Sequence, residues 1–452
     1  MEIEFKRFQV KKPIDKVVKS QNIIFLSTFW WLLWISAIVL LEFYYRDLSG
    51  DRIKILHGQY WFFIIAQLSI LGLLIDQNKR LMESFYTNKS LILGFGLLFF
   101  AQSLSAIFGI NAVYGLRLLA ILISTSLPFI LLGITSHFMT VKSRLAPQLF
   151  VSLACALGAC ILEATGPIYL ADVIIENYLM PPRQRWAFMF TEANALGGMM
   201  ALGIVVALFQ MRVSKSWVIT WGLGVLILPI ISFVFWETNA RGALLWILVT
   251  LLFYGGLTVR NLLVKLEGFD IHIYFLPLGF VFGLLLLVLI FFRQEIADFL
   301  RLNQADFTTG RMEIWLMYLE KFKSHPLLGF GFGASNQLMA DFDVKGPYPI
   351  SGPLNIFIGI LGETGLLGFV AMIWLWCGAT LRAWRIVKSQ LFHQEGDFHY
   401  AFFLMVTLIS LAAHQNGEWQ VMRITPFNFL FFFLVSAAWT LPERTKTQPC
   451  KM

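Results

Sequence analysis

The sequence is dominated by long uninterrupted apolar runs, and FLPLGFVFGLLLLVLIFF at residues 275–292 is the clearest of them. Such a run lacks the alternation of polar and apolar residues that the strands of a membrane barrel need, because those strands face lipid and lumen in turn. It does match the roughly 20 apolar residues with which a helix crosses a bilayer. The chain is 58% hydrophobic and only 14% charged, so we expect an all-α integral membrane protein.

Apolar stretches of spanning length recur along the whole chain and predict about 12 transmembrane helices. They lie near residues 23–42, 60–76, 90–109, 117–139, 146–165, 190–209, 217–235, 240–258, 271–292, 354–378, 399–414 and 424–441. We therefore expect a single polytopic membrane domain over residues 1–452. Its largest part outside the helices is a loop at 293–353, between the ninth and tenth helices.

Lysine and arginine concentrate on one side of this predicted topology. They crowd the N-terminal tail, every second turn after it and the C-terminal tail. Basic residues favour the cytoplasmic side of membrane proteins, so we expect both termini inside and the loop at 293–353 outside. The net charge of +8 follows from this anchoring and calls for no nucleic acid partner. The four cysteines show neither disulfide nor metal spacing, and we expect no metal.

The outer loop contains one charged and aromatic segment, TTGRMEIWLMYLEKFKSHPLLGFGFG at residues 308–333. Thr308, Thr309 and Gly310 supply N-cap chemistry, and Pro326 bounds a helix of about 14 residues. Apolar and aromatic residues recur on one face of it: Ile314, Trp315, Tyr318, Leu319 and Phe322. This pattern predicts an interfacial helix that lies flat on the outer membrane surface, or alternatively a brace that closes the helix bundle. The glycines that follow lack the Lys-Ser/Thr of a nucleotide site and favour a re-entrant turn.

Four arginines are predicted at the outer membrane face: Arg185, Arg241, Arg311 and Arg423. An arginine at the apolar boundary costs free energy unless it is paired, so arginines on the outer side are candidates for binding an anion. Guanidinium binds phosphate oxygens in a bidentate manner and keeps its charge, which suits a pyrophosphate group. The alternatives are contacts with phospholipid head groups or pairing with Glu192, Glu237 or Glu313.

Three motifs resemble those of the O-antigen ligase and O-antigen polymerase superfamily over roughly residues 180–380. They are TEANALGG, NARGALL, and the loop segment at 308–333 followed by LNIFIGILGETGLLG. The resemblance implies an inner-membrane glycosyltransferase of lipopolysaccharide or exopolysaccharide biosynthesis, without cofactor, that uses sugars carried by undecaprenyl pyrophosphate at the periplasmic face. The partners it implies are that donor, a glycan or lipid A core acceptor, and a flippase and chain-length regulator nearby.

The resemblance also assigns roles to individual residues. Arg185 and Arg241 match positions that hold the pyrophosphate, Arg311 matches a loop arginine, and Arg423 is a further candidate for the same group. Asn194, Trp315 and Asn355 stand in the matching motifs and are candidates for positioning the substrate.

Transfer from a pyrophosphate carrier requires charge neutralisation, a positioned acceptor hydroxyl and, optionally, a base that contributes about 10² to 10⁴ in rate. The candidates for the base are His414, His325 and Glu363. A histidine at a helix end is often only a hydrogen-bonding residue. A carboxylate within a span, such as Glu363, could instead fix helix packing.

The sequence departs from the family at two positions. Family ligases carry histidine before the asparagine of the tenth helix, where this chain has Leu354, and a serine before the Arg-Gly of the eighth, where it has Ala240. The missing histidine favours a polymerase of O-antigen, capsule or exopolysaccharide. A ligase that transfers glycan to lipid A core or protein stays as an alternative. A transporter or flippase is a third hypothesis, since twelve helices with both ends inside is also a transporter plan.

Overall fold

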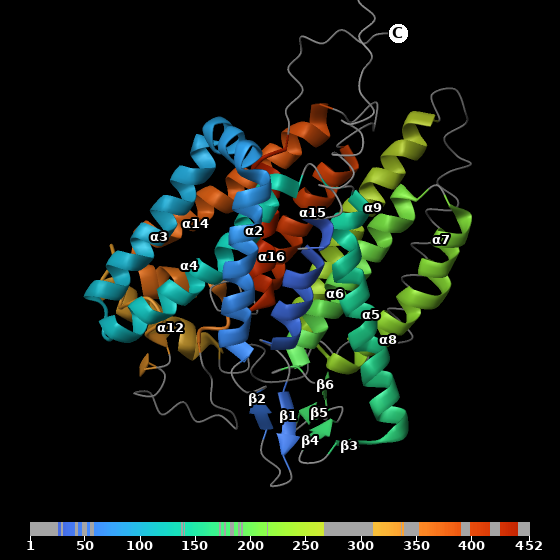
Figure 1. Ribbon diagram of the computed structural model, residues 1–452, viewed down its shortest axis with the longest axis horizontal. Helices are drawn as coiled ribbons and strands as arrows, with labels where there is room; N and C mark the ends of the chain where they lie inside the picture. Colours follow the sequence, from blue (N-terminus) through green and yellow to red (C-terminus); the bar gives the residue numbers. More distant parts are fainter. Residues whose placement is uncertain are drawn as a thin grey trace, which may run out of the picture.

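The structure is a computed structural model that describes residues 26–265, 311–338, 352–389, 398–415 and 425–441, apart from short gaps within the first two ranges. Figure 1 shows a bundle of long helices with a few short strands at one end. Eight helical segments in the described part are long and apolar enough to cross a membrane. They are α3 (Lys89–Phe108), α4 (Ala112–Thr135), α5 (Val141–Thr165), α6 (Ala193–Val213), the run of α7 (Trp217–Trp221), η2 (Gly222–Ile227) and α8 (Leu228–Thr238), α9 (Arg241–Lys265), α14 (Ile356–Ser389) and α15 (Phe398–Gln415).

Shorter apolar helices complete the bundle: Leu26–Leu40, the apolar part Trp61–Leu73 of α2 (Gly58–Thr87), and α16 (Pro426–Trp439). The predicted all-α membrane class is confirmed, and each predicted span overlaps a helix except that at 271–292, which lies outside the described residues. The total of 12 spans, the cytoplasmic termini and the outer position of the 293–353 loop stay predictions.

Short strands join some of the helices, and the all-helical prediction did not include them. The strands β1 (Tyr44–Asp47), β2 (Arg52–Lys54), β3 (Ile168–Leu170) and β4 (Val173–Ile175) form an antiparallel sheet in the order β2-β1-β4-β3. A separate antiparallel pair joins β5 (Tyr178–Met180) to β6 (Arg185–Phe188). Strands of three or four residues carry too little periodicity to stand out beside the long apolar runs.

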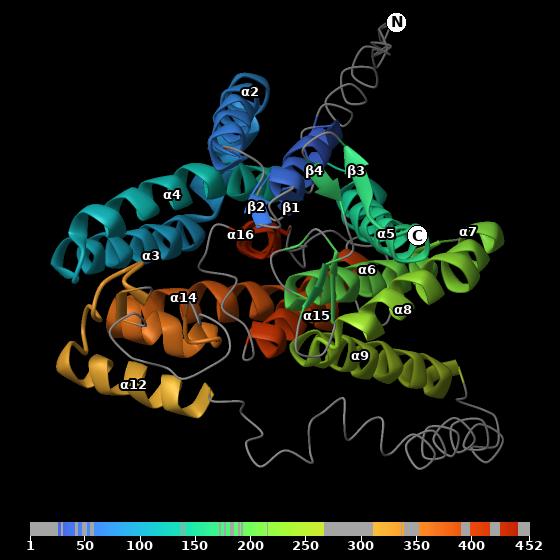
Figure 2. The same ribbon diagram turned by 90° about the horizontal axis from the view of Figure 1, so that it is seen from below.

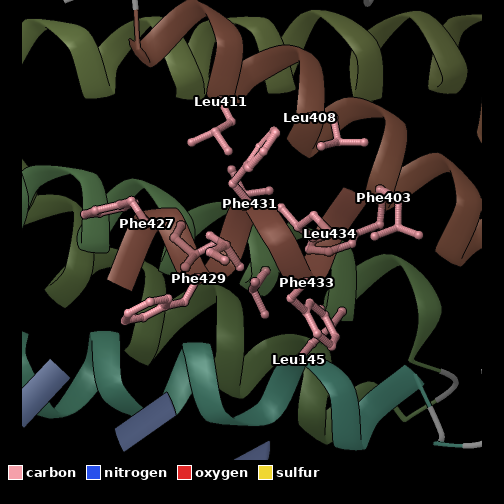
Figure 3. Close-up of a cluster of buried hydrophobic side chains, with 14 of the residues drawn as sticks. Leu145, Phe403, Leu408, Leu411, Phe427, Phe429, Phe431, Phe433 and Leu434 are labelled. Carbon is pink, nitrogen blue, oxygen red and sulfur yellow. The ribbon is translucent and has the colours of Figure 1, made fainter. Parts of the chain in front are cut away.

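Helix α16 lies in the middle of the bundle (Figure 2). Its segment PFNFLFFFLV is buried on all sides, as expected for a helix that is apolar around its whole circumference. Phe433 stacks on Trp30 with ring centroids 4.2 Å apart, and Phe429 stacks on Phe129 at 4.8 Å. Figure 3 shows Phe429 and Phe433 on one side of α16 and Phe431 on the other side, toward Leu408 and Leu411 of α15. This aromatic core holds helices from both halves of the chain together.

The tenth predicted span, at 354–378, differs from the single straight helix that we expected. Gly365 has φ 64° and ψ −163° and interrupts α14. The rings of Phe357 and Trp376, which a continuous helix would separate by roughly 28 Å, have centroids 5.8 Å apart. Helix α14 is therefore a hairpin with a short arm before Gly365 and a long arm after it.

The predicted helix of the outer loop is present as α12 (Arg311–Ser324). Its buried residues Ile314, Met317 and Tyr318 pack on Phe330, Ala334 and Leu338 of the same chain. The apolar face of α12 thus covers protein, which fits the alternative of a brace. The position of α12 at the membrane surface stays a prediction.

Candidate functional site

The short strand β6 and the start of α6 bring Arg185 next to Asn194. Arg185 opens β6, and its Nη1 donates a hydrogen bond to Oδ1 of Asn194 at 3.1 Å. Both side chains are partly exposed. The structure thus joins a residue predicted to hold the pyrophosphate to one predicted to position the substrate.

The start of α9 lies against the start of α6. A Cβ atom built on Gly197 would lie 2.3 Å from Cβ of Ala240 and 2.8 Å from Oγ1 of Thr238, so only glycine permits this approach. Arg241 follows Ala240 directly and is the first residue of α9. The arginines of the TEANALGG and NARGALL regions therefore stand at adjoining helix starts, at one end of the bundle.

Backbone strain marks the same places. Among the described residues, three that are not glycine have positive φ: Phe188 at 50°, Asn239 at 48° and Leu354 at 51°. Each lies within three positions of a predicted site residue, namely Arg185, Arg241 or Asn355, at the approach to a helix. Strained residues of this kind concentrate at functional sites, so the strain supports a site at these three helix starts.

His414 lies near the end of α15, at the contact with α6, α9 and α16. It is fully buried, and its ring centroid is 5.5 Å from that of Trp246 and 5.9 Å from that of Phe427. Its Nε2 lies 3.2 Å from where a Cβ of Gly198 would be. Trp246 follows Arg241 by little more than one helical turn. His414, which lies against Trp246, is therefore about one turn of α9 further into the bundle than Arg241.

A second group of predicted residues surrounds the start of α14. Trp315 on α12 donates from Nε1 to the carbonyl oxygen of Pro353 at 2.7 Å. Oδ1 of Asn355 accepts hydrogen bonds from the backbone N–H groups of Phe357 (2.9 Å) and Ile358 (3.2 Å). Asn355 is therefore the N-cap of the short arm, and Trp315 ties α12 to the chain just before it.

Replacing Asn355 separates its capping role from its predicted substrate role. Asn355→Ala should lower the free energy of unfolding by about 1 kcal/mol, the usual value of an N-cap, whereas Asn355→Asp keeps a capping oxygen. If capping is its whole contribution, Asn355→Asp retains both thermal stability and activity. Retained stability with lost activity would instead show that the amide contacts substrate. Thermal unfolding of the purified protein and a glycan transfer assay measure the two effects.

The glycine-rich segment after α12 fills the break in α14. The N–H groups of Phe330 and Gly331 donate to the carbonyl oxygens of Gly362 (2.9 Å) and Glu363 (3.1 Å). On the far side of the break, the N–H of Leu366 donates to the carbonyl of Pro326 at 2.9 Å. The glycine-rich segment thus supplies hydrogen bonds that the broken helix lacks, and the predicted re-entrant turn toward the membrane stays a prediction.

The two other candidate bases have contrasting surroundings. His325 is exposed at the end of α12, where its backbone N–H donates to the carbonyl of Phe322 at 3.0 Å. Glu363 is buried, with 4% of the residue exposed, and its carboxylate accepts hydrogen bonds from the N–H groups of Gly333 (3.1 Å) and Ser335 (3.2 Å) and from the Ser335 hydroxyl. These contacts give Glu363 a structural task, and its role as a base stays a prediction.

The structure thus forms two groups from the predicted residues, one on α6, α9 and α15 and one on α12 and α14, and α14 packs on α15. Arg311 opens α12 in the second group. Arg423 lies outside the described residues, as does Glu192. Sequence reasoning missed Ser335 altogether, and its only signal was its place just after the glycines. Within the described ranges, no cluster of three or more His, Cys, Asp or Glu residues could hold a metal.

Comparison with known proteins adds one finding. Residues 230–373 match the family model described as O-antigen ligase. The match includes α12, the glycine-rich segment, Asn355 and Glu363 of the second group, and Arg241 of the first, whereas Arg185, Asn194 and His414 lie outside it. No protein of curated function matches the chain significantly.

Proposed function

We propose that this multi-pass membrane protein, whose residues 230–373 match the family model described as O-antigen ligase, is a glycosyltransferase that polymerises repeat units carried on undecaprenyl pyrophosphate. The product is O-antigen, capsule or exopolysaccharide, and the site faces the periplasm of a bacterial inner membrane. The observation that carries the proposal is the position of Arg185, hydrogen-bonded to Asn194, and of Arg241 at the adjoining starts of α6 and α9.

The arginine pair suits the leaving group of this reaction. As the bond between the anomeric carbon and the pyrophosphate breaks, negative charge grows on the departing oxygens. Fixed guanidinium groups stabilise that charge, and such preorganised electrostatics usually contribute more to catalysis than any other effect. Arg185 is already oriented by Asn194, so it loses little freedom on binding. Arg311 and Arg423 are further candidates for the same role.

The acceptor side needs a hydroxyl and a place for its proton. The hydroxyl oxygen of the acceptor sugar forms the new bond to the anomeric carbon, and its proton passes to a base. Of the three candidates, His414 packs on the two helices whose starts carry the arginines, since Trp246 of α9 and Gly198 of α6 both lie against it. We assign it as the base of the proposed reaction.

The residue before Asn355 favours polymerase over ligase. Family ligases have histidine there, whereas Leu354 has no group that can accept a proton. The site can still act, because a base contributes only part of the rate. The ligase reading stays as the alternative within the family.

The transporter alternative gains one observation, because broken helices such as α14 are common in transporters, where half-helix ends face the substrate. Here the backbone groups at the break bond instead to the chain itself, as the pairs Phe330 to Gly362 and Leu366 to Pro326 illustrate. These backbone groups at the break are thus hydrogen-bonded within the protein and do not face a substrate. We therefore keep the glycosyltransferase as the proposed function.

Glycan length in a deletion strain tests the proposal. The strain is complemented with wild type, His414→Ala or Arg385→Ala, the last an exposed arginine of α14 that serves as the control. We expect a single repeat on the surface lipid in the deletion and with His414→Ala, and a full ladder with wild type and Arg385→Ala. Full-length glycan retained on undecaprenyl pyrophosphate would indicate a ligase, and an unchanged ladder in the deletion would revive the transporter.

A further inference from the structure

The glycine-rich segment Gly329–Ser335 has the shape of an anion-binding loop, yet six of its seven backbone N–H groups already have acceptors inside the protein. Consecutive backbone N–H groups in alternating conformations form concavities that bind anions, and Gly329, Gly331 and Gly333 of this segment all have positive φ. The N–H groups of Gly333 and Ser335, with the Ser335 hydroxyl, converge on the two carboxylate oxygens of Glu363. A side chain of the protein thus occupies the place of a bound anion.

Four other backbone N–H groups of the segment also have acceptors inside the protein. The N–H of Gly329 donates to the carbonyl of His325 at 2.8 Å, and that of Ala334 to the carbonyl of Gly331 at 3.2 Å. Those of Phe330 and Gly331 bond to carbonyl oxygens of α14. With six of its seven backbone N–H groups bonded within the protein, the segment is a poor cradle for a substrate phosphate, and its geometry serves another purpose.

The contacts of the segment with α12 indicate that purpose. Phe330 and Ala334 form the surface on which Ile314 and Tyr318 of α12 pack, with the rings of Tyr318 and Phe330 5.4 Å apart. Helix α12 begins at Arg311. Contacts that fix the Gly329–Ser335 segment therefore also fix α12. They thereby position Arg311 and the hydrogen bond from Trp315 to Pro353.

We propose that Glu363 is a positioning residue whose carboxylate serves as the internal anion of the Gly329–Ser335 loop and thereby fixes α12, with Arg311 and Trp315, against the start of α14. The inference rests on the proposed function for its catalytic consequence. It reassigns Glu363 from candidate base to clamp, because both carboxylate oxygens are engaged by the loop. Glu363 then acts on the reaction only through the residues it positions.

Small anions test this reading in the purified full-length protein in lipid nanodiscs. The variants are Glu363→Ala, Glu363→Gln, and Thr364→Ser as the matched control, whose hydroxyl keeps its bond to the carbonyl of Ile360. Tm and glycan transfer are measured in sodium chloride, formate and nitrate at equal ionic strength. Formate and nitrate are planar oxyanions of carboxylate size, and nitrate is too weak a base to accept the proton of a sugar hydroxyl.

We expect Glu363→Ala to lower Tm and to reduce transfer by about 10²-fold, the loss that a small misplacement of catalytic groups can cause. Formate and nitrate should both raise its Tm and restore transfer, with no effect on wild type or Thr364→Ser. The Tm and transfer rate of Glu363→Gln should not respond to formate or nitrate. Its side-chain amide already fills the space, and its NH2 group is a donor that cannot accept a hydrogen bond from the loop. Rescue of transfer by formate but not nitrate, with Tm unchanged by the substitution, would identify Glu363 as a base and overturn the proposal.

Two features keep the test decisive. If Glu363→Ala cannot be purified, Ser335→Ala removes one of the three donors, and an unchanged Tm in that variant contradicts the clamp. The Tm measurements involve no glycan, so they decide the anion role of Glu363 even if the protein proves to have another activity. Absence of transfer in wild type would count against the proposed function alone.

Discussion

Gly365→Ala should destabilise the protein severely, by at least about 3 kcal/mol. The backbone at this position, φ 64° and ψ −163°, belongs to a region that only glycine occupies readily. A Cβ atom there would lie 2.4 Å from the carbonyl carbon and oxygen of Leu327 and 2.5 Å from the nitrogen of Leu328. These are backbone atoms, so no side-chain rotation relieves the contact. Thermal unfolding in detergent, followed by size-exclusion chromatography, measures the effect.

Gly96→Ala is the matched control for this substitution. Gly96 lies within α3, and no atom comes within 4 Å of the place where its Cβ would be. Since alanine is the better helix former by about 1 kcal/mol, Gly96→Ala should leave Tm unchanged or raise it. If Gly365→Ala unfolded at the same temperature as Gly96→Ala, the break in α14 and the docking of the loop would both be wrong.

Arg241→Ala should reduce glycan transfer by about 10² to 10³-fold, the loss caused by removing one preorganised donor from a site of developing charge. Arg241→Lys should recover only part of the activity, because an ammonium cannot bind two phosphate oxygens in the fixed geometry of a guanidinium. Both variants should fold, since the side chain is partly exposed at the helix start. Initial rates of polymerisation with purified lipid-linked repeat units give the numbers.

Arg385→Ala provides the comparison, as an exposed arginine on the long arm of α14. It removes the same charge from the chain and should keep wild-type rates. Wild-type rates in Arg241→Ala as well would remove Arg241 from the site. A similar loss in both variants would point to net charge rather than to a specific contact.

Much of the helical architecture could be predicted because spanning helices require long apolar runs, and hydropathy detects those runs directly. The predicted bounds of the spans at 90–109 and 399–414 agree closely with α3 and α15. The reversal within α14 could not be found in this way. Both arms are apolar, and the turn depends on contacts with residues some thirty positions earlier in the chain, which no local window includes.

The candidate site also divides into parts that the sequence predicted and parts that it could not predict. Motif residues placed Arg185 and Arg241 near helix starts, and the structure adds that Gly197 lets the two starts touch. The partners of Glu363 were out of reach, because a carboxylate in an apolar span indicates only that some donor must lie nearby. Ser335 and the glycine N–H groups are donors of ordinary type, and only the folded loop gathers them.

The two arms of α14 also differ in how they can enter a bilayer. At 1.5 Å per residue the long arm measures roughly 36 Å and the short arm roughly 13 Å, so only the long arm crosses a hydrocarbon core of roughly 30 Å. The carbonyl oxygens at the end of the short arm receive their hydrogen bonds from Phe330 and Gly331, which leave the ribosome earlier. During biosynthesis the loop is therefore made before the arm to which it bonds, and these hydrogen bonds form only when the short arm closes onto the loop. A chain with a defective loop should insert its long arm normally and fail only at this later step.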